Sequence, residues 1–211
     1  MKLPATVSEP MQHAPDDYAA LMLDYAAGAL PPAFRLLVEV HADLNRGARG
    51  WVAQADATGG ALLEQVEPVP MAATLLPPRL VEQPEKADAW SAARSRITLA
   101  ADGADGLAWR RSLFGFMDHR LPIAGASLLK IPAGRAMPRH THGGDELTLV
   151  LRGAFADERG LYQAGELVFA DAHVEHTPRV IGDAECVCLT AETGALRIRT
   201  WWARPLAGLL N

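Results

Sequence analysis

Three side chains in the second half of the chain have the types and spacing of metal ligands. His140 and His142 are separated by one residue, so on a β-strand both imidazoles point to the same side. Glu146 joins that face if the strand continues or returns after the turn at Gly143 and Gly144. Two imidazoles and a carboxylate that converge on a protein interior favour a divalent metal ion.

A fourth ligand is expected from the later segment YQAGELVFADAHVEHTP. It contains His173 and His176, which would lie on opposite sides of one strand because three positions separate them. Burying three histidines and a carboxylate without a metal would leave several polar groups unsatisfied. A set of this kind accepts zinc, iron, manganese, nickel or copper, and we expect one divalent metal per chain, with zinc as the first choice.

The sequence around these residues predicts short β-strands. From about Leu107 the sequence breaks into brief apolar or alternating runs divided by Gly, Pro and Asp, which is typical of a β-sandwich or barrel. The preceding run RITLAADGADGLAWRRS is interpreted as entry strands around a turn. Cys186 and Cys188 are interpreted as buried reduced thiols. A redox-responsive role would require an accessible thiolate of low pKa.

The first third of the chain reads as helical. Tyr18, Leu21, Met22 and Tyr25 recur at the spacing of one helix face. A second helix is expected from about Pro32 to Arg46, since proline is tolerated in a first turn. A third is expected from about Trp51 to Val66, interrupted by a glycine pair.

The fold class is therefore mixed, with a small helical bundle followed by an all-β barrel. Residues 67–90 contain five prolines and predict a linker with at most a short helix. We expect a helical domain at 1–75, a Pro-rich linker and entry segment at 76–105, and the barrel at 106–211.

Composition limits the classes of function. The chain has 211 residues, is 49% hydrophobic and 21% charged, and carries a formal net charge of −5. It is an ordinary globular composition, and bulk charge predicts no direct binding to nucleic acid or to an anionic membrane. No apolar run is long enough to span a bilayer, and the N-terminus lacks the apolar core of a secretory signal, so we expect a cytoplasmic protein.

The candidate ligands match the cupin family. The first cupin motif, G(X)5HXH(X)3–4E(X)6G, fits from Gly134 to Gly153 at every fixed position. Of the second motif, Gly165 and His176 are in register, while the remaining fixed positions differ at Asp171, His173 and Val180. The resemblance implies a double-stranded β-helix barrel, and its register selects His176 as the fourth ligand beside His140, His142 and Glu146.

The whole chain resembles the ChrR-type anti-sigma factors, in which a helical anti-sigma domain precedes a cupin. The stretches that carry the likeness are LMLDYAAGAL, TGGALLEQVEPV, ELTLVLRGAF, FADAHVEHTP and ECVCLTAE. By resemblance, the helices would sequester an extracytoplasmic-function sigma factor, and the cupin would sense a stress signal of an oxidative or singlet-oxygen type.

The helical domain of that family binds zinc through an upstream histidine and an HxxxCxxC motif. His41 matches, but Asn45 and Ala48 replace the two cysteines, and Asp16, with His13 close by, stands near the upstream position. The helical zinc site is therefore expected to be lost, with His41 packed as an ordinary helix residue. Pro77-Pro78 interrupts the segment where the family has a further helix.

Three functions follow from these residues. The first is a ChrR-like anti-sigma factor that binds its sigma factor through the N-terminal helices and uses the cupin as a metal-containing sensor. The alternative is a metal-dependent cupin enzyme, dioxygenase- or isomerase-like, with the helices as a packing arm or homodimer contact, although no catalytic residue is assigned. The third is a ligand-binding cupin with a structural arm.

Overall fold

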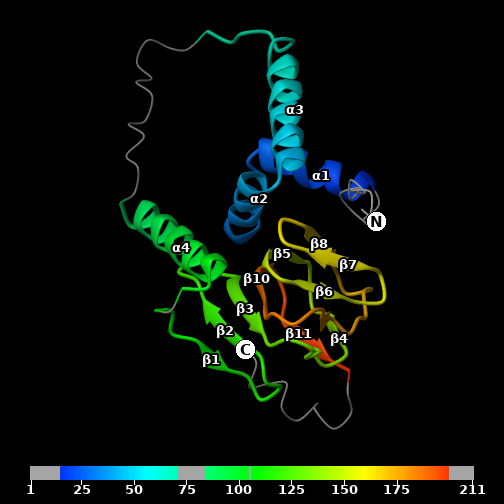
Figure 1. The fold of residues 1–211 in the computed structure, drawn as a ribbon. Helices are drawn as coiled ribbons and strands as arrows, with labels where there is room; N and C mark the ends of the chain where they lie inside the picture. Colours follow the sequence, from blue (N-terminus) through cyan, green and yellow to red (C-terminus); the bar gives the residue numbers. More distant parts are fainter. Residues whose placement is uncertain (1–14, 71–83, 105, 200–211) are drawn as a thin grey trace, which may run out of the picture.

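The computed structural model describes residues 15–70, 84–104 and 106–199, and Figure 1 shows helices followed by a β-barrel. The helices are α1 (Pro15–Ala26), α2 (Pro32–Leu44), α3 (Arg46–Leu63) and α4 (Pro84–Asp102). The mixed fold class with a helical part and a β cupin part is confirmed. Within the described residues, no helix is both long and apolar enough to cross a membrane.

The barrel is built from short strands in three sheets. The strands are β1 (Arg110–Arg111), β2 (Met117–Arg120), β3 (Ala126–Ile131), β4 (His140–His142), β5 (Glu146–Arg152), β6 (Ala154–Ala156), β7 (Leu161–Gln163), β8 (Leu167–Ala170), β9 (Arg179–Val180), β10 (Cys186–Glu192) and β11 (Leu196–Ile198). The largest sheet has the order β1-β2-β3-β10-β5-β8, and the smaller ones are β7-β6-β9 and β11-β4. All the pairings between these strands are antiparallel.

The large sheet has two buried faces, and strand alternation separates them. On β10, Cys186 and Cys188 join the apolar cluster inside the barrel, while Val187 and Leu189 join the cluster shared with the helices. Because successive side chains of a strand point to opposite faces, every residue from Cys186 to Ala191 is buried. This explains why CVCLTAE reads as a nearly continuous apolar run.

The helices and the sheet share one hydrophobic core. Members of this cluster come from α1, α2 and α4 as well as from β3, β5, β8 and β10. Helices α2 and α4 both pack against the sheet (Figure 1), and Leu36, Leu37 and Val38 of α2 are fully buried. The helical part and the barrel are therefore joined through a common hydrophobic core rather than through a contact between two separate surfaces.

Asn45 alone separates α2 from α3. It ends α2 through its backbone N–H, which donates to His41 O at 2.8 Å. Its side chain then accepts from Ala48 N at 3.2 Å and caps α3. Helix α3 runs unbroken through Gly59 and Gly60, so the expected interruption is wrong. Its far end projects away from the barrel (Figure 1).

Helix α4 was not expected from the sequence. The predictions of at most a short helix in 67–90 and of entry strands in 96–112 are wrong for 84–102, where the structure has a helix of 19 residues. Pro84 is compatible with a helix start, and the segment is rich in alanine. Its buried positions fall at helical spacing against the shared core: Ala93, Ile97 and Ala100.

The domain boundaries at 1–75, 76–105 and 106–211 stay a prediction. Helix α4 lies inside the expected linker, and the first strand begins at Arg110. Pro77-Pro78 lies outside the described residues, and α4 follows it in the chain. A further helix thus follows the prolines, while the segment that they interrupt, where the resemblance implied a helix, is not described.

Candidate metal centre

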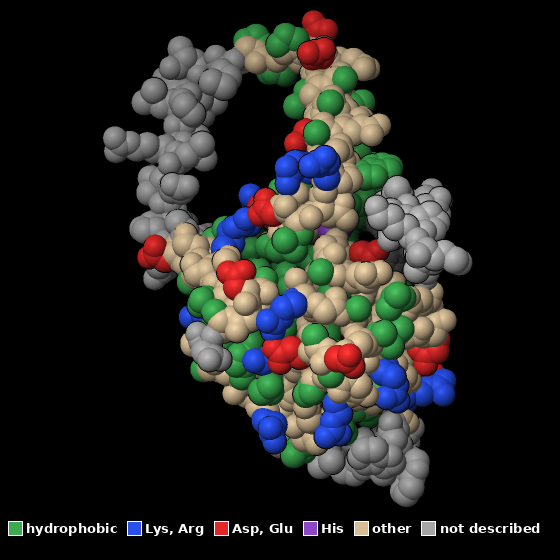
Figure 2. All heavy atoms as spheres, viewed as in Figure 1, with side chains coloured by type: hydrophobic (Ala, Val, Ile, Leu, Met, Phe, Trp, Pro, Cys, Tyr) green, Lys and Arg blue, Asp and Glu red, His purple; other side chains and the backbone are tan. Residues whose placement is uncertain are grey.

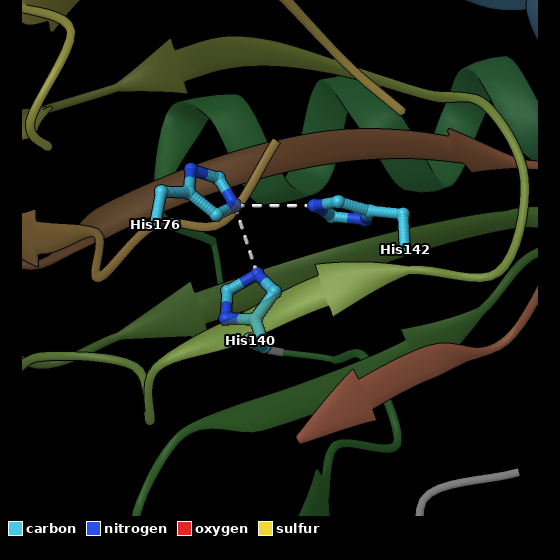
Figure 3. A group of neighbouring side chains, drawn as sticks. All are labelled: His140, His142 and His176. Carbon is cyan, nitrogen blue, oxygen red and sulfur yellow. Dashed lines mark hydrogen bonds between the residues drawn. The ribbon is translucent and has the colours of Figure 1, made fainter. Parts of the chain in front are cut away.

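Three histidines converge inside the barrel (Figure 3). His140 and His142 belong to β4, and His176 belongs to the connection between β8 and β9. A β-bridge fixes this connection, with His140 N donating to His176 O at 3.1 Å and His176 N donating to His140 O at 3.0 Å. The Nε2 atom of His176 lies 2.9 Å from that of His140 and 3.2 Å from that of His142. All three side chains are buried.

The other ring nitrogen of each histidine faces a hydrogen-bond acceptor. The acceptors are Pro138 O for His140 (2.7 Å), Glu146 Oε2 for His142 (3.1 Å) and Asp157 Oδ2 for His176 (2.8 Å). Carbonyl and carboxylate oxygens accept, so each Nδ1 carries the proton and each Nε2 presents a lone pair. Three lone pairs directed at one point repel one another unless a cation lies between them.

The spacing fits a bound metal. Metal–imidazole bonds of about 2.0–2.1 Å in a tetrahedral site place the nitrogens about 3.3 Å apart, close to the observed separations. Burial, followed by the proximity of His176, lowers the pKa of His140 to about 4. The imidazole is therefore neutral at pH 7, which is the form that binds metals. Among the described residues, these three histidines form the group that could hold a metal ion.

Glu146 lies beside this group. Its Oε2 interacts with His142 Nδ1, and its Oε1 accepts from Thr148 Oγ1 at 2.8 Å. Burial opposes ionisation of Glu146, but the bonds from His142 and Thr148 outweigh it, and its pKa is lowered. The structure therefore places a carboxylate against a ligand imidazole, and direct binding of the metal by Glu146 stays a prediction.

His173 does not join the centre. Its side chain is exposed, and its backbone N–H donates to Asp171 Oδ1 at 2.8 Å in a turn. His176, three residues later, points into the barrel beside β4. Of the two histidines that the residue pattern offered as the fourth ligand, the structure therefore places only His176 at the centre.

Asp157 is a site residue that the sequence reasoning missed. Its side chain is fully buried, and its Oδ1 accepts from the backbone N–H groups of Arg159 at 2.8 Å and Gly160 at 3.2 Å. Burial raises its pKa, but the bond with His176 and the Arg159 interactions outweigh this and lower it to about 2. The sequence signal is weak because an aspartate followed by a glycine three positions later indicates only a turn.

In the helices, the residues at the positions of the family's zinc ligands have other roles in this protein. His41 is buried, and its Nε2 lies 3.0 Å from the Tyr18 hydroxyl. Asn45 is a helix cap, and Ala48 is packed. His13 and the side chain of Asp16 lie outside what the structure describes. His41 is thus a packed helix residue with a tyrosine partner.

Replacing His41 with glutamine is expected to flatten the pH dependence of stability. Burial lowers the pKa of His41 from 6.5 to about 4, partly opposed by the Gly165 backbone. The unfolded chain therefore takes up this proton first as the pH falls, and the native state loses about 2 kcal/mol by pH 5 but nothing above pH 7. Urea unfolding of the metal-free protein at both pH values measures this. Equal losses in wild type and His41→Gln would contradict it.

The two cysteines are buried and free. Their Sγ atoms are 3.6 Å apart, and the contact with Cys186, followed by burial, raises the pKa of Cys188 well above its usual value. The prediction of buried reduced thiols is confirmed. The accessible thiolate of low pKa that a redox-responsive role requires is not what this site provides.

Comparisons with known proteins agree with this arrangement. Residues 117–196 match the family model of the ChrR Cupin-like domain. The chain is 37% identical over 193 residues to the anti-sigma-E factor ChrR of Cereibacter sphaeroides, covering 86% of this chain and 91% of that protein. It also matches the crystal structure of Rhodobacter sphaeroides SigE in complex with the anti-sigma ChrR, with a TM-score of 0.66, 34% identity and coverage of 87% of this chain and 99% of that chain.

A third match is a solved RmlC-like cupin protein from Ralstonia eutropha JMP134, at 27% identity, a TM-score of 0.37 and coverage of 44% of this chain and 68% of that chain. Fold and site define a cupin barrel with a buried three-histidine centre, preceded by packed helices. With the match over most of both chains, this protein belongs to the ChrR family of anti-sigma factors.

Proposed function

We propose that this protein binds an extracytoplasmic-function sigma factor through its helices and holds one divalent metal in its barrel as a sensor. The observation that carries the proposal is the extent of the likeness, which includes both the helices and the cupin. The relative is an anti-sigma-E factor, and the similar solved structure is a complex with SigE. A chain that kept only the cupin's function would not need to resemble ChrR across its helices.

Exposed apolar side chains on the helices support a protein partner. Figure 2 shows hydrophobic side chains along α3 where it projects from the barrel. The exposed large hydrophobics of the helices include Leu23, Leu44, Trp51, Leu62 and Leu63. Amphipathic helices that leave apolar side chains in solvent commonly dock them into a partner's groove.

We propose zinc as the metal, with His140, His142 and His176 as nitrogen ligands and Glu146 as the fourth ligand. Three imidazoles and a carboxylate suit a four-coordinate zinc site, while iron, manganese or nickel would use the same set with positions left open. When bound, the metal supplies a positive charge that fixes the three rings. The free, buried thiols are consistent with a reducing cytoplasm.

Binding to a sigma factor is expected to depend on the projecting end of α3. Rhodobacter sphaeroides SigE, the partner in the similar solved complex, is a concrete probe, together with the extracytoplasmic-function sigma factors of the source organism. We expect a stable complex on gel filtration and at least tenfold weaker binding for Leu63→Glu, since an interfacial charge without a partner costs more than about 1.4 kcal/mol. Leu63 is 73% exposed in the free protein.

Leu113→Glu is the matched control, because Leu113 is 65% exposed but lies between β1 and β2 of the barrel. It should leave sigma binding unchanged. If the folded wild-type protein bound none of these sigma factors, the proposal would be wrong. Equal effects of the two substitutions would move the binding surface away from α3.

The alternative function, a dioxygenase- or isomerase-like enzyme, has one observation in its favour. A cavity of about 60 Å³ adjoins the centre and is lined in part by His140, Glu146, His176 and Cys188. It could admit a molecule as small as oxygen. Oxygen consumption by the iron-loaded protein in the presence of small diketones and related acids separates the two functions, because a regulator would show none.

A further inference from the structure

We propose that residues 154–166 form a rigid connection between the three-histidine centre and the junction of α2 and α3. This linking segment comprises β6, β7 and the turn that follows. It contacts His176 through Asp157 and contacts Asn45 through Gly165. The proposal rests on the sensor role proposed above, because it describes how a change at the metal would reach the helices.

The first contact holds the metal centre. Asp157 Oδ2 accepts from His176 Nδ1 at 2.8 Å, and two backbone N–H groups of the Asp157–Gly160 turn bind its Oδ1. The Arg159 side chain lies 3.4 Å from Oδ2 and donates to Phe169 O at 2.6 Å. The carboxylate is therefore fixed by its own hairpin, and the orientation of His176 and the position of this hairpin end depend on each other.

The body of the linking segment is anchored to the barrel core by one buried side chain from each of its two strands. Strand β6 pairs with β7 on one side and with β9 on the other. Phe155 and Tyr162 are opposite each other in this pairing, are both buried, and have ring centroids 5.1 Å apart. A paired and packed hairpin of this length moves as a unit, since bending it would break the ladder and open a void.

The second contact is made with the helices. Gly165 is buried with φ +88°, its N–H donates to Val150 O at 2.8 Å, and its carbonyl accepts from Asn45 Nδ2 at 3.3 Å. A side chain at Gly165 would meet the carbonyl of Leu44 at 3.8 Å. The turn therefore lies directly against the end of α2.

Asn45 connects the Gly165 turn to the start of α3. The same side chain that donates to Gly165 O also caps α3 through Ala48 N. A shift of the Gly165 turn would disturb the start of α3 and the end of α2 together. Asn45 and Ala48 occupy the positions at which the family has zinc-binding cysteines, so a hydrogen-bonded contact with the barrel stands where a metal would otherwise hold the helices.

Hydrogen–deuterium exchange on the full-length protein tests the connection, with zinc-loaded protein compared with protein stripped by a chelator. In wild type, removing the metal should raise amide exchange about tenfold in residues 154–166 and also in residues 41–50, in line with the loss of hydrogen bonds at both ends. No sigma factor is present, so this result is independent of whether sigma binding is found.

Asn45→Ser is the deciding variant. Serine still caps a helix but is too short to reach Gly165, so α3 should keep its start. We expect unchanged zinc content and an unchanged response of residues 154–166, with the response of residues 41–50 reduced to that of the surrounding helix. Gln54→Ala, an exposed substitution on α3, should behave as wild type. A full helix response in Asn45→Ser, or no response of residues 154–166 in wild type, would overturn the proposal.

Discussion

Replacing His176 with alanine is expected to remove the bound metal. His176 Nε2 faces the Nε2 atoms of both other histidines, so the substitution takes away one ligand and leaves two imidazoles on one strand. Loss of an outer partner alone typically weakens metal binding by 10–100-fold, so the loss of a ligand should cost at least about 100-fold. Metal analysis of the purified protein and competition with a chromophoric chelator measure this as a fall from one equivalent per chain to almost none.

His173→Ala is the matched control because it removes an exposed imidazole only three residues away. It should retain a full equivalent of metal with unchanged affinity. Retention of metal by folded His176→Ala would contradict the centre, and loss of metal in His173→Ala would mean that the connection between β8 and β9 binds in another register. Two equivalents of zinc in the wild type would require a second site.

Phe34→Ala is expected to destabilise the whole protein by about 3–5 kcal/mol, the usual cost of deleting a buried phenylalanine ring. Phe34 is 6% exposed, belongs to the core shared by helices and sheet, and lines the same hollow as Leu147 of β5 and Leu167 of β8. Because one core serves both parts, helical circular dichroism and a barrel probe should report the same shifted transition. Urea unfolding with both signals measures the change.

Leu62→Ala provides the comparison on a helix outside the core. Leu62 is 60% exposed near the end of α3, and its truncation should change stability by no more than about 0.5 kcal/mol. Two separate transitions in Phe34→Ala, with the barrel unaffected, would show that the helices and the sheet do not depend on a common core.

The convergence of the histidines could be predicted from the sequence because strand parity is a local rule. His140 and His142 must face the same side of any strand, and the cupin register supplied His176. The acceptors behind the rings could not be predicted in this way. Pro138 is adjacent in sequence, but Asp157 reaches His176 only through a hairpin whose placement depends on tertiary packing.

Helix α4 was missed because the sequence analysis used only one of two properties of proline. Proline marks where a helix cannot continue, but it is also well tolerated at a helix start, and at Pro84 only the first property was considered.

The role of Asn45 could be predicted only in part. Its replacement of a cysteine indicated what the helical part had lost, but its contact with Gly165 is made across the fold and leaves no trace in local pattern.

The connection between α2 and α3 is a single residue. Asn45 is the C-cap of α2 and the N-cap of α3, so inserting a single residue there would separate the two caps and change the direction in which α3 leaves α2. The exposed residues beyond Leu63 lie outside any helix, up to the end of the described range at Pro70. Length variation among relatives of this chain should therefore be absent at the first place and tolerated at the second, a pattern that an alignment of their sequences would display.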